Sequence, residues 1–267
     1  MNNLDFWLTF GPLFVINGFI VVAFVTFIFV SRTRPKTKDI EDRHSSVVLN
    51  KWIREFWMWL LEPFFKFFIY FKISPNAISI LGSLVAVFAA AAFAVGHFGL
   101  GGWLMVLGAS FDFFDGRVAR AMNRCTEAGS FIDSCLDRVS EGITLTGLAF
   151  FYRDSFIFWV VMLAYLGSIV TSYSKAKGET MGIDYSGGMM QRPERIAYLG
   201  AGGIIAPVFS YFLYSYVLGW FPALTLAQLT GYIYLIPLSF VAIFCSATAI
   251  KRVVNIMILL DKKQGIR

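Results

Sequence analysis

The sequence predicts an all-α integral membrane protein: a six-helix transmembrane bundle with an interfacial amphipathic helix and one extra N-terminal transmembrane helix. The first reason is composition. Of the 267 residues 57% are hydrophobic and only 15% are charged, whereas a soluble domain carries about 25% charged residues. The second reason is a set of apolar segments long enough to cross a bilayer, which takes about 20 helical residues each. The third is the distribution of lysine and arginine, which fits a single orientation.

Residues 8–30 form the first predicted span. No basic stretch precedes it and it is long for a signal peptide, so we expect an anchor that is not cleaved. The six bundle spans are predicted at residues 77–96, 100–121, 130–151, 155–174, 195–217 and 227–250. The chain then divides into an anchor with a basic linker (1–48), an interfacial helix (49–72), a transmembrane domain (73–258) and a cytoplasmic tail (259–267).

The linker after the first span is strongly basic and sets the orientation. Cytoplasmic loops of membrane proteins carry an excess of lysine and arginine. Alternating the spans from a cytoplasmic linker places the N-terminus outside and leaves Arg153 as the only basic residue on the outer side. We therefore expect a protein of the cytoplasmic membrane. The net charge of +6 is explained by this topology, so nucleic acid is not an expected partner.

Residues 49–72 combine charge and aromatic residues at helical spacing. Lys51, Glu55, Glu62 and Lys66 recur along one helical face, with tryptophan and phenylalanine between them. Such a helix lies in the membrane interface, where aromatic rings favour the headgroup level. We expect it to bend at Pro63, because proline interrupts the helical hydrogen bonding.

Four aspartates are the principal candidate site. Asp112 and Asp115 are three residues apart, and Asp133 and Asp137 are four apart, so each pair shares one helical face. A loop near 121–129 joins the two helices, and the carboxylates are expected to converge at the cytoplasmic side. Carboxylate oxygens suit Mg²⁺, Mn²⁺ or Ca²⁺. Four negative charges exceed those of one divalent ion, so two ions are expected, as in metal clamps for displacement at phosphorus.

Two other interpretations of the aspartates are open. They could pair with nearby arginines, or they could line a cation pathway, since transporters also carry acids within the membrane. Clustering at one membrane face, together with small residues at Gly116 and Ala119, favours the metal site. Arg120 could pair with a phosphate. Glu141, one turn beyond the last aspartate, could extend the site, but we expect it to balance Arg138 instead.

The pattern Asp112-x-x-Asp115-Gly116-x-x-Ala119-Arg120-x8-Gly129-x3-Asp133-x3-Asp137 resembles the signature of the CDP-alcohol phosphotransferase family at every fixed position. The similarity covers residues 50–255. It implies transfer of a phosphatidyl group from a CDP-linked lipid, such as CDP-diacylglycerol, to an alcohol with release of CMP. It implies Mg²⁺ or Mn²⁺, held by Asp112, Asp115 and Asp133, with Asp137 as a ligand or catalytic base. It implies a homodimer among membrane lipids, and a nucleotide site formed by Asn76, Ser79, Asp112, Gly116, Ala119 and Arg120.

A second group of basic residues bears on the acceptor alcohol. Arginine is favoured where a phosphate is bound by two parallel hydrogen bonds, so a phosphorylated polyol is the expected acceptor. The segments around Lys175 and Arg192 resemble the phosphatidylinositol phosphate synthase branch, which favours inositol phosphate; glycerol 3-phosphate is the alternative. The expected acceptor-phosphate residues are Ser172, Lys175, Arg192, Arg195 and Arg252.

Overall fold

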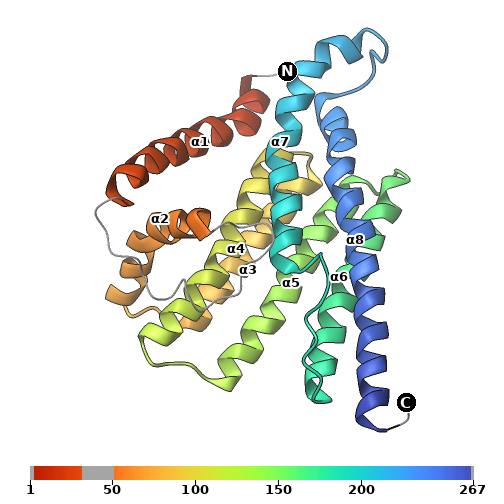
Figure 1. The fold of residues 1–267 in the computed structure, drawn as a ribbon. Coiled ribbons are helices and arrows are strands. Elements are labelled where there is room, and N and C mark those ends of the chain that lie inside the picture. The colour runs from red at the N-terminus through yellow and green to blue at the C-terminus, as the bar shows by residue number, and fades with distance from the viewer. Residues whose placement is uncertain (1–2, 32–50, 266–267) are drawn as a thin grey trace.

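The computed structural model describes residues 3–31 and 51–265. Within these ranges the chain forms α-helices and no strand, which confirms the all-α prediction. The helices, labelled in Figure 1, are α1 (Asn3–Ser31), α2 (Lys51–Tyr70), α3 (Pro75–Ala94), α4 (Phe98–Ala121), α5 (Glu127–Phe151), α6 (Ile157–Thr180), α7 (Arg192–Leu218) and α8 (Leu226–Lys263).

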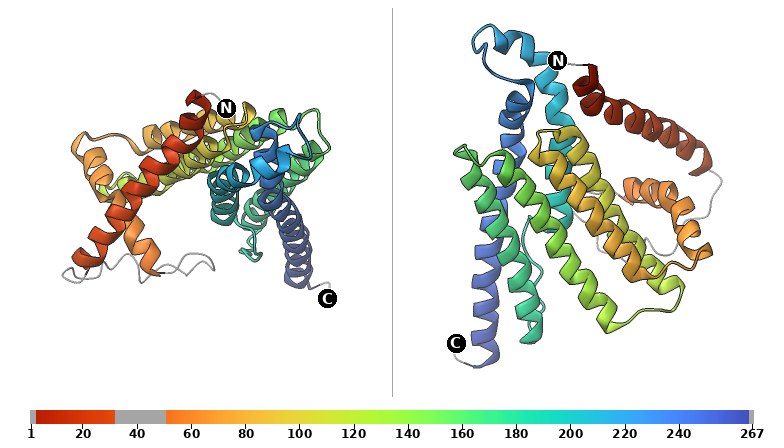
Figure 2. Two further views of the ribbon diagram at one scale, coloured as in Figure 1. Left: turned by 90° about the horizontal axis from the view of Figure 1, so that it is seen from above. Right: turned by 180° about the vertical axis from the view of Figure 1, so that it is seen from behind.

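Helices α3 to α8 form one bundle, with α1 and α2 against one side of it (Figures 1 and 2). Within the bundle α3 packs against α4 and α5, α7 packs against α4 and α8, and α6 packs against α8. The largest buried apolar cluster draws residues from α3 through α8, among them Phe93, Phe98, Leu148 and Tyr234. This cluster joins all six bundle helices, and a second, smaller one lies where α2, α3 and α4 meet.

Each predicted span corresponds to one helix. Five of these helices, α1, α3, α6, α7 and α8, are long and apolar enough to cross a membrane. Helices α4 and α5 have 24 and 25 residues, which is sufficient length, but their aspartates, arginines and glycines lower their mean hydropathy. The count of seven spans remains a prediction. Helix α8 continues to Lys263, beyond the predicted end of its span at residue 250.

Two N-terminal helix caps define where α3 and α5 begin, beside the candidate site. The Ser74 hydroxyl accepts a hydrogen bond from the Ala77 amide at 3.3 Å, and Pro75 starts α3; both residues are favoured at a helix N-terminus. The Thr126 hydroxyl accepts from the Gly129 amide at 3.0 Å and starts α5. These caps bring the first turns of α3 and α5 beside the end of α4.

Glycines allow the bundle helices to approach closely, as is common between transmembrane helices. A Cβ at Gly102 on α4 would overlap the backbone of α7 at Gly200, and one at Gly147 on α5 would overlap the backbone of α3 at Ala90. The contacts hold α4 to α7 and α3 to α5. Residues far apart in sequence can therefore share one site.

Helix α2 packs on the side of α4 away from α5. Arg117 Nη2 lies 2.7 Å from Glu62 Oε2, and Phe68 packs against Phe114. Pro63 lies inside the helix, and Figures 1 and 2 show two stretches of α2 at an angle to each other, as the sequence predicts. The interfacial position of α2 remains a prediction.

Candidate active site

The aspartates converge where α4 ends and α5 begins. Asp112, Asp133 and Asp137 each offer a carboxylate oxygen within 4.8 Å of the others, and all three side chains are half-buried. The predicted convergence is confirmed for these three. Closely spaced carboxylate oxygens suit a divalent ion such as Mg²⁺ or Mn²⁺, so the donor set fits the ions that the sequence leads us to expect.

The fourth aspartate lies apart from this group. Asp115 is 4% exposed. Its carboxylate accepts hydrogen bonds from the Ser79 hydroxyl at 2.5 Å and from the Gly116 amide at 2.5 Å. The structure thus joins Asp115 to the start of α3, a link of 36 residues along the chain. Its predicted role as a metal ligand remains a prediction.

A pocket of about 290 Å³ lies among the first turns of α3 and α5 and the last turns of α4. Of the six residues predicted to hold the nucleotide, five line this pocket: Asn76, Ser79, Gly116, Ala119 and Arg120. Asp112, the sixth, does not line it. Asp133 belongs to both this pocket and the carboxylate cluster, and Asp115 also lines the pocket. We call it the nucleotide pocket.

Small residues keep the nucleotide pocket open. A Cβ at Gly116 would meet only Arg120 Nη1, at 3.5 Å, and one at Gly129 would approach the Thr126 hydroxyl at 3.0 Å. Arg124, Thr126 and Ser130 also line the pocket, although we had not assigned them to it. Their position between the two halves of the aspartate pattern was the signal that could have found them.

A second pocket, of about 240 Å³, lies among α5, α6, α7 and α8. All five residues predicted for the acceptor phosphate line it: Ser172, Lys175, Arg192, Arg195 and Arg252. Asp137 also lines it, so one face of the carboxylate cluster opens toward these basic residues. We call it the acceptor pocket.

Arg195 is held in the acceptor pocket by a buried ion pair. The side chain is 1% exposed; its Nε and Nη2 lie 2.5 and 2.8 Å from the two carboxylate oxygens of Glu141. Ser168 also donates to Glu141, at 2.9 Å. The prediction that Glu141 balances Arg138 is wrong. Arg138 is exposed and donates to the Ser134 carbonyl, whereas helical spacing turns Glu141 inward toward α6 and α7.

Arg252 is 3% exposed and is held by backbone carbonyls. Its guanidinium donates to Thr171 at 2.7 Å, Ser186 at 3.2 Å and Gly187 at 3.3 Å. Within the described residues no carboxylate forms an ion pair with it. In the described part of the chain its positive charge is therefore solvated by carbonyl dipoles and not neutralised by an ion pair.

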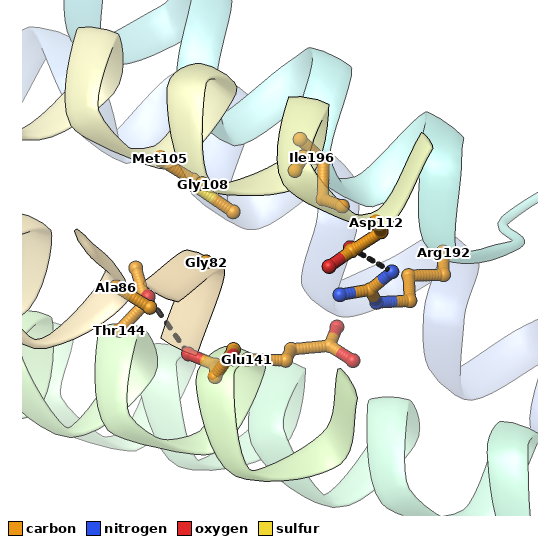
Figure 3. A pocket seen from close by; sticks show the side chains of 11 residues that line it. Gly82, Ala86, Met105, Gly108, Asp112, Glu141, Thr144, Arg192 and Ile196 are labelled. Carbon is orange, nitrogen blue, oxygen red and sulfur yellow. Dashed lines mark hydrogen bonds and ion pairs between the residues drawn. The ribbon is translucent and has the colours of Figure 1, made fainter. Parts of the chain in front are cut away.

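Arg192, on the first turn of α7, connects the acceptor pocket with the carboxylate cluster. Its Nη1 lies 2.6 Å from Asp112 Oδ2, and its Nη2 lies 2.9 Å from Asp137 Oδ1. Figure 3 shows Arg192 and Asp112 pointing toward each other beside a small cavity that Gly82, Ala86 and Met105 help to line. Sequence reasoning placed Arg192 with the acceptor but missed this bridge, because the bridge joins helices distant in sequence.

Comparison with known proteins places this chain in a family. The CDP-alcohol phosphatidyltransferase family model matches residues 72–250, which include the carboxylate cluster, the nucleotide pocket and every residue of the acceptor pocket except Arg252. Helices α1 and α2 precede the match.

Curated relatives agree with the family match. The chain is 34% identical over 172 residues to the phosphatidylinositol phosphate synthase of Streptomyces avermitilis, covering 62% of this chain and 69% of the relative. It is 35% identical over 138 residues to the enzyme of that name from Mycobacteroides abscessus, covering 50% and 63%. It is 36% identical over 128 residues to the archaetidylinositol phosphate synthase of Methanothermobacter thermautotrophicus, covering 48% and 64%.

Solved structures support the fold. Crystal structures of Mycobacterium tuberculosis phosphatidylinositol phosphate synthase resemble this chain with TM-scores of 0.59, with CDP-DAG bound, and 0.60, in complex with manganese and citrate. Sequence identities are 24% and 22%; both cover 73% of this chain, with 92% and 88% of the respective crystal chains. The helical bundle therefore has the fold of these crystal structures. Together with the aspartate pattern and the match over residues 72–250, these comparisons establish that the chain belongs to the CDP-alcohol phosphatidyltransferase family.

Proposed function

We propose that the protein transfers the phosphatidyl group of CDP-diacylglycerol to inositol phosphate and releases CMP. The observation that carries this proposal is the position of the carboxylate cluster between two different pockets. Asp133 lines the nucleotide pocket, and Asp137 lines the basic acceptor pocket. The oxygens of the two side chains lie within 4.8 Å, so a donor and an acceptor could meet there.

The nucleotide pocket would bind the cytidine diphosphate part of the donor. In this proposal Asn76 and Ser79 lie on one side, Gly116 and Ala119 leave room for the diphosphate, and Arg120 pairs with it. Asp112, Asp115, Asp133 and Asp137 would hold Mg²⁺ or Mn²⁺. Bound divalent ions supply neutralisation of the diphosphate and of the departing CMP.

The acceptor pocket would bind the phosphate of the acceptor through Ser172, Lys175, Arg192, Arg195 and Arg252. This anchoring directs the acceptor hydroxyl toward Asp137, which accepts its proton as general base. The hydroxyl oxygen then forms a bond to the lipid-linked phosphorus, and the bond from that phosphorus to CMP breaks. Holding both reactants in one geometry supplies much of the rate enhancement.

The relatives support the headgroup assignment. Both the phosphatidylinositol and the archaetidylinositol phosphate synthases are named for the same headgroup on different lipids. A pocket that recognises a phosphorylated polyol rather than the lipid chains agrees with this. We further propose that the site faces the cytoplasm, that the N-terminus lies outside and that the enzyme is a homodimer in the cytoplasmic membrane.

A CMP-release assay tests the function. Purified protein with Mg²⁺ or Mn²⁺ and CDP-diacylglycerol would receive inositol phosphate, glycerol 3-phosphate, inositol or serine in parallel. We expect the fastest CMP release with inositol phosphate. Faster release with glycerol 3-phosphate would overturn the acceptor assignment alone. Absence of CMP release with all four acceptors would overturn the reaction, and cation flux in liposomes without any CDP-lipid would then favour a transporter.

A further inference from the structure

A groove of about 530 Å³ lies between α1 and α2, outside the residues that match the family. Phe19, Val22, Ala23 and Thr26 of α1 form one wall, at spacings of three and four residues. The other wall is formed by α2, through Trp59, Leu60, Glu62, Pro63 and Lys66. The volume lies within the range of about 300–1,000 Å³ that is typical of ligand sites.

The groove exists because the two helices touch at one end and separate at the other. Phe27 of α1 packs against Phe56 and Trp59 of α2, with ring centroids 5.5 and 5.6 Å apart. Helix α2 also changes direction along its length (Figures 1 and 2), and Pro63 lies inside it. Along the groove Phe19 and Val22 of α1 stay exposed, whereas Ala23 is buried in the cluster that α1 forms with α2.

Most polar groups of the groove already have partners. The Thr26 hydroxyl donates to the Val22 carbonyl at 2.8 Å, and the Glu62 carboxylate forms the ion pair with Arg117 at 2.7 Å. Lys66 is exposed, and no acidic side chain in residues 3–31 and 51–265 forms an ion pair with it. The groove therefore offers an apolar surface with one uncompensated positive charge.

We propose that this groove binds one anionic phospholipid of the surrounding membrane. One acyl chain would lie along Phe19, Val22, Ala23 and Leu60, and the headgroup phosphate would contact the Lys66 ammonium. The groove lies beside a helix that is long and apolar enough to cross a membrane, and Phe19 and Val22 are 61% and 66% exposed. Its contents would therefore come from the bilayer. Basic side chains near the membrane surface favour anionic lipids by about 1 kcal/mol each.

This lipid site is distinct from the proposed transfer reaction. None of its lining residues belongs to the nucleotide pocket or the acceptor pocket. A polar link to the reaction site runs through Glu62, whose partner Arg117 follows Gly116 on α4. A lipid in the groove would pack beside this ion pair and support the contact between α2 and α4.

Native mass spectrometry of the delipidated protein tests whether the Lys66 ammonium contacts the lipid headgroup. Phosphatidylglycerol and phosphatidylcholine with identical acyl chains would be titrated into wild type, Lys66→Gln and the control Lys72→Gln, which removes the same charge outside the groove. We expect one phosphatidylglycerol to bind wild type, and Lys66→Gln to weaken that binding about fivefold with phosphatidylcholine unchanged. Equal affinity of wild type and Lys66→Gln for phosphatidylglycerol, or equal losses in both lysine variants, would overturn the headgroup contact.

A matched pair of substitutions on α1 tests the groove itself. Val22→Trp places an indole in the groove, whereas Val21→Trp makes the same change at a position that is 60% exposed and does not line it. We expect Val22→Trp alone to abolish retention of the lipid. Equal retention by the two variants, or no lipid bound by wild type, would show that the groove is not the binding site. Neither readout depends on CMP release, so failure of this inference and failure of the proposed function are distinguishable.

Discussion

The two pockets beside the carboxylate cluster differ in how far their basic groups are already engaged by the protein. In the nucleotide pocket, Arg120 and Arg124 are exposed and form no ion pair in the described part of the chain. In the acceptor pocket, Arg195 forms an ion pair with one glutamate, Arg252 donates to three backbone carbonyls, and Arg192 contacts two aspartates. Binding in the first pocket adds contacts, whereas binding in the second must also rearrange or share existing ones.

The two pockets also differ in how far apart in the sequence their residues lie. The nucleotide pocket is built around one continuous pattern between Asp112 and Asp137, together with the start of α3. The acceptor pocket depends on pairs such as Glu141 and Arg195, which are 54 residues apart. Lys175 is the most weakly paired cation of the acceptor pocket. Its partner Glu179 is 3.6 Å away on an exposed helix face, and exposed ion pairs contribute little to stability.

The largest expected effect on turnover comes from substitutions in the carboxylate cluster, which lies between the two pockets. Asp137→Asn keeps the shape of the side chain but removes the proton acceptor, and we expect turnover in the CMP-release assay to fall about 10²–10⁴-fold, the usual contribution of a general base. Asp133→Asn should also lose nearly all turnover, because the cluster loses a charged oxygen ligand. Turnover within a few-fold of wild type would contradict these roles.

A matched control for this prediction is Asp154→Asn. Asp154 pairs with Arg153, and its side chain is 87% exposed. The substitution is the same, but it lies outside the site. We expect wild-type turnover and an unchanged thermal unfolding temperature in detergent.

The second prediction concerns the buried ion pair. Arg195→Ala leaves the Glu141 carboxylate, which is 9% exposed, without its cationic partner, and such a loss costs about 3–5 kcal/mol. We expect a lower unfolding temperature in addition to a higher KM for the acceptor. The double variant Glu141→Leu with Arg195→Met should recover most of the stability but little activity. Full recovery of activity would contradict a role of Arg195 in binding the acceptor.

Sequence alone predicted the helices and the aspartate convergence, because helical spacing fixes which side chains share a face. It also grouped the five expected acceptor residues, which the structure brings to one pocket; their role in binding the acceptor remains a prediction. It did not predict which partner each charge would take. Glu141 was assigned to Arg138, three residues away, but tertiary packing pairs it with Arg195 on α7. Asp115 is likewise turned toward Ser79 by the α3–α4 contact.

The third prediction examines Arg192, which belongs to both regions. Arg192→Gln removes a charge from the acceptor pocket, so we expect the KM for the acceptor to rise about 10- to 100-fold. The same change frees Asp112 Oδ2 and Asp137 Oδ1, which the guanidinium contacts at 2.6 and 2.9 Å. Mn²⁺ binding, followed by electron paramagnetic resonance, should therefore become tighter.

The matched control for Arg192 is Arg153→Gln, which removes a charge that is paired with Asp154 outside both pockets. It should change neither quantity. Weaker Mn²⁺ binding in Arg192→Gln would mean that the guanidinium orients the aspartates rather than competing for them.

The smallest expected effect is in the nucleotide pocket and comes from one methyl group. At Gly116 a Cβ would meet only Arg120 Nη1, at 3.5 Å, so Gly116→Ala should not lower the unfolding temperature and should raise it slightly, because alanine favours a helix over glycine. The methyl group would occupy space that we assign to the diphosphate, and we expect the KM for CDP-diacylglycerol to rise about tenfold. Gly18→Ala is the control, because a Cβ there meets nothing within 4 Å. A higher KM for the acceptor with an unchanged KM for the donor would exchange the assignments of the two pockets, since Gly116 lines only the nucleotide pocket.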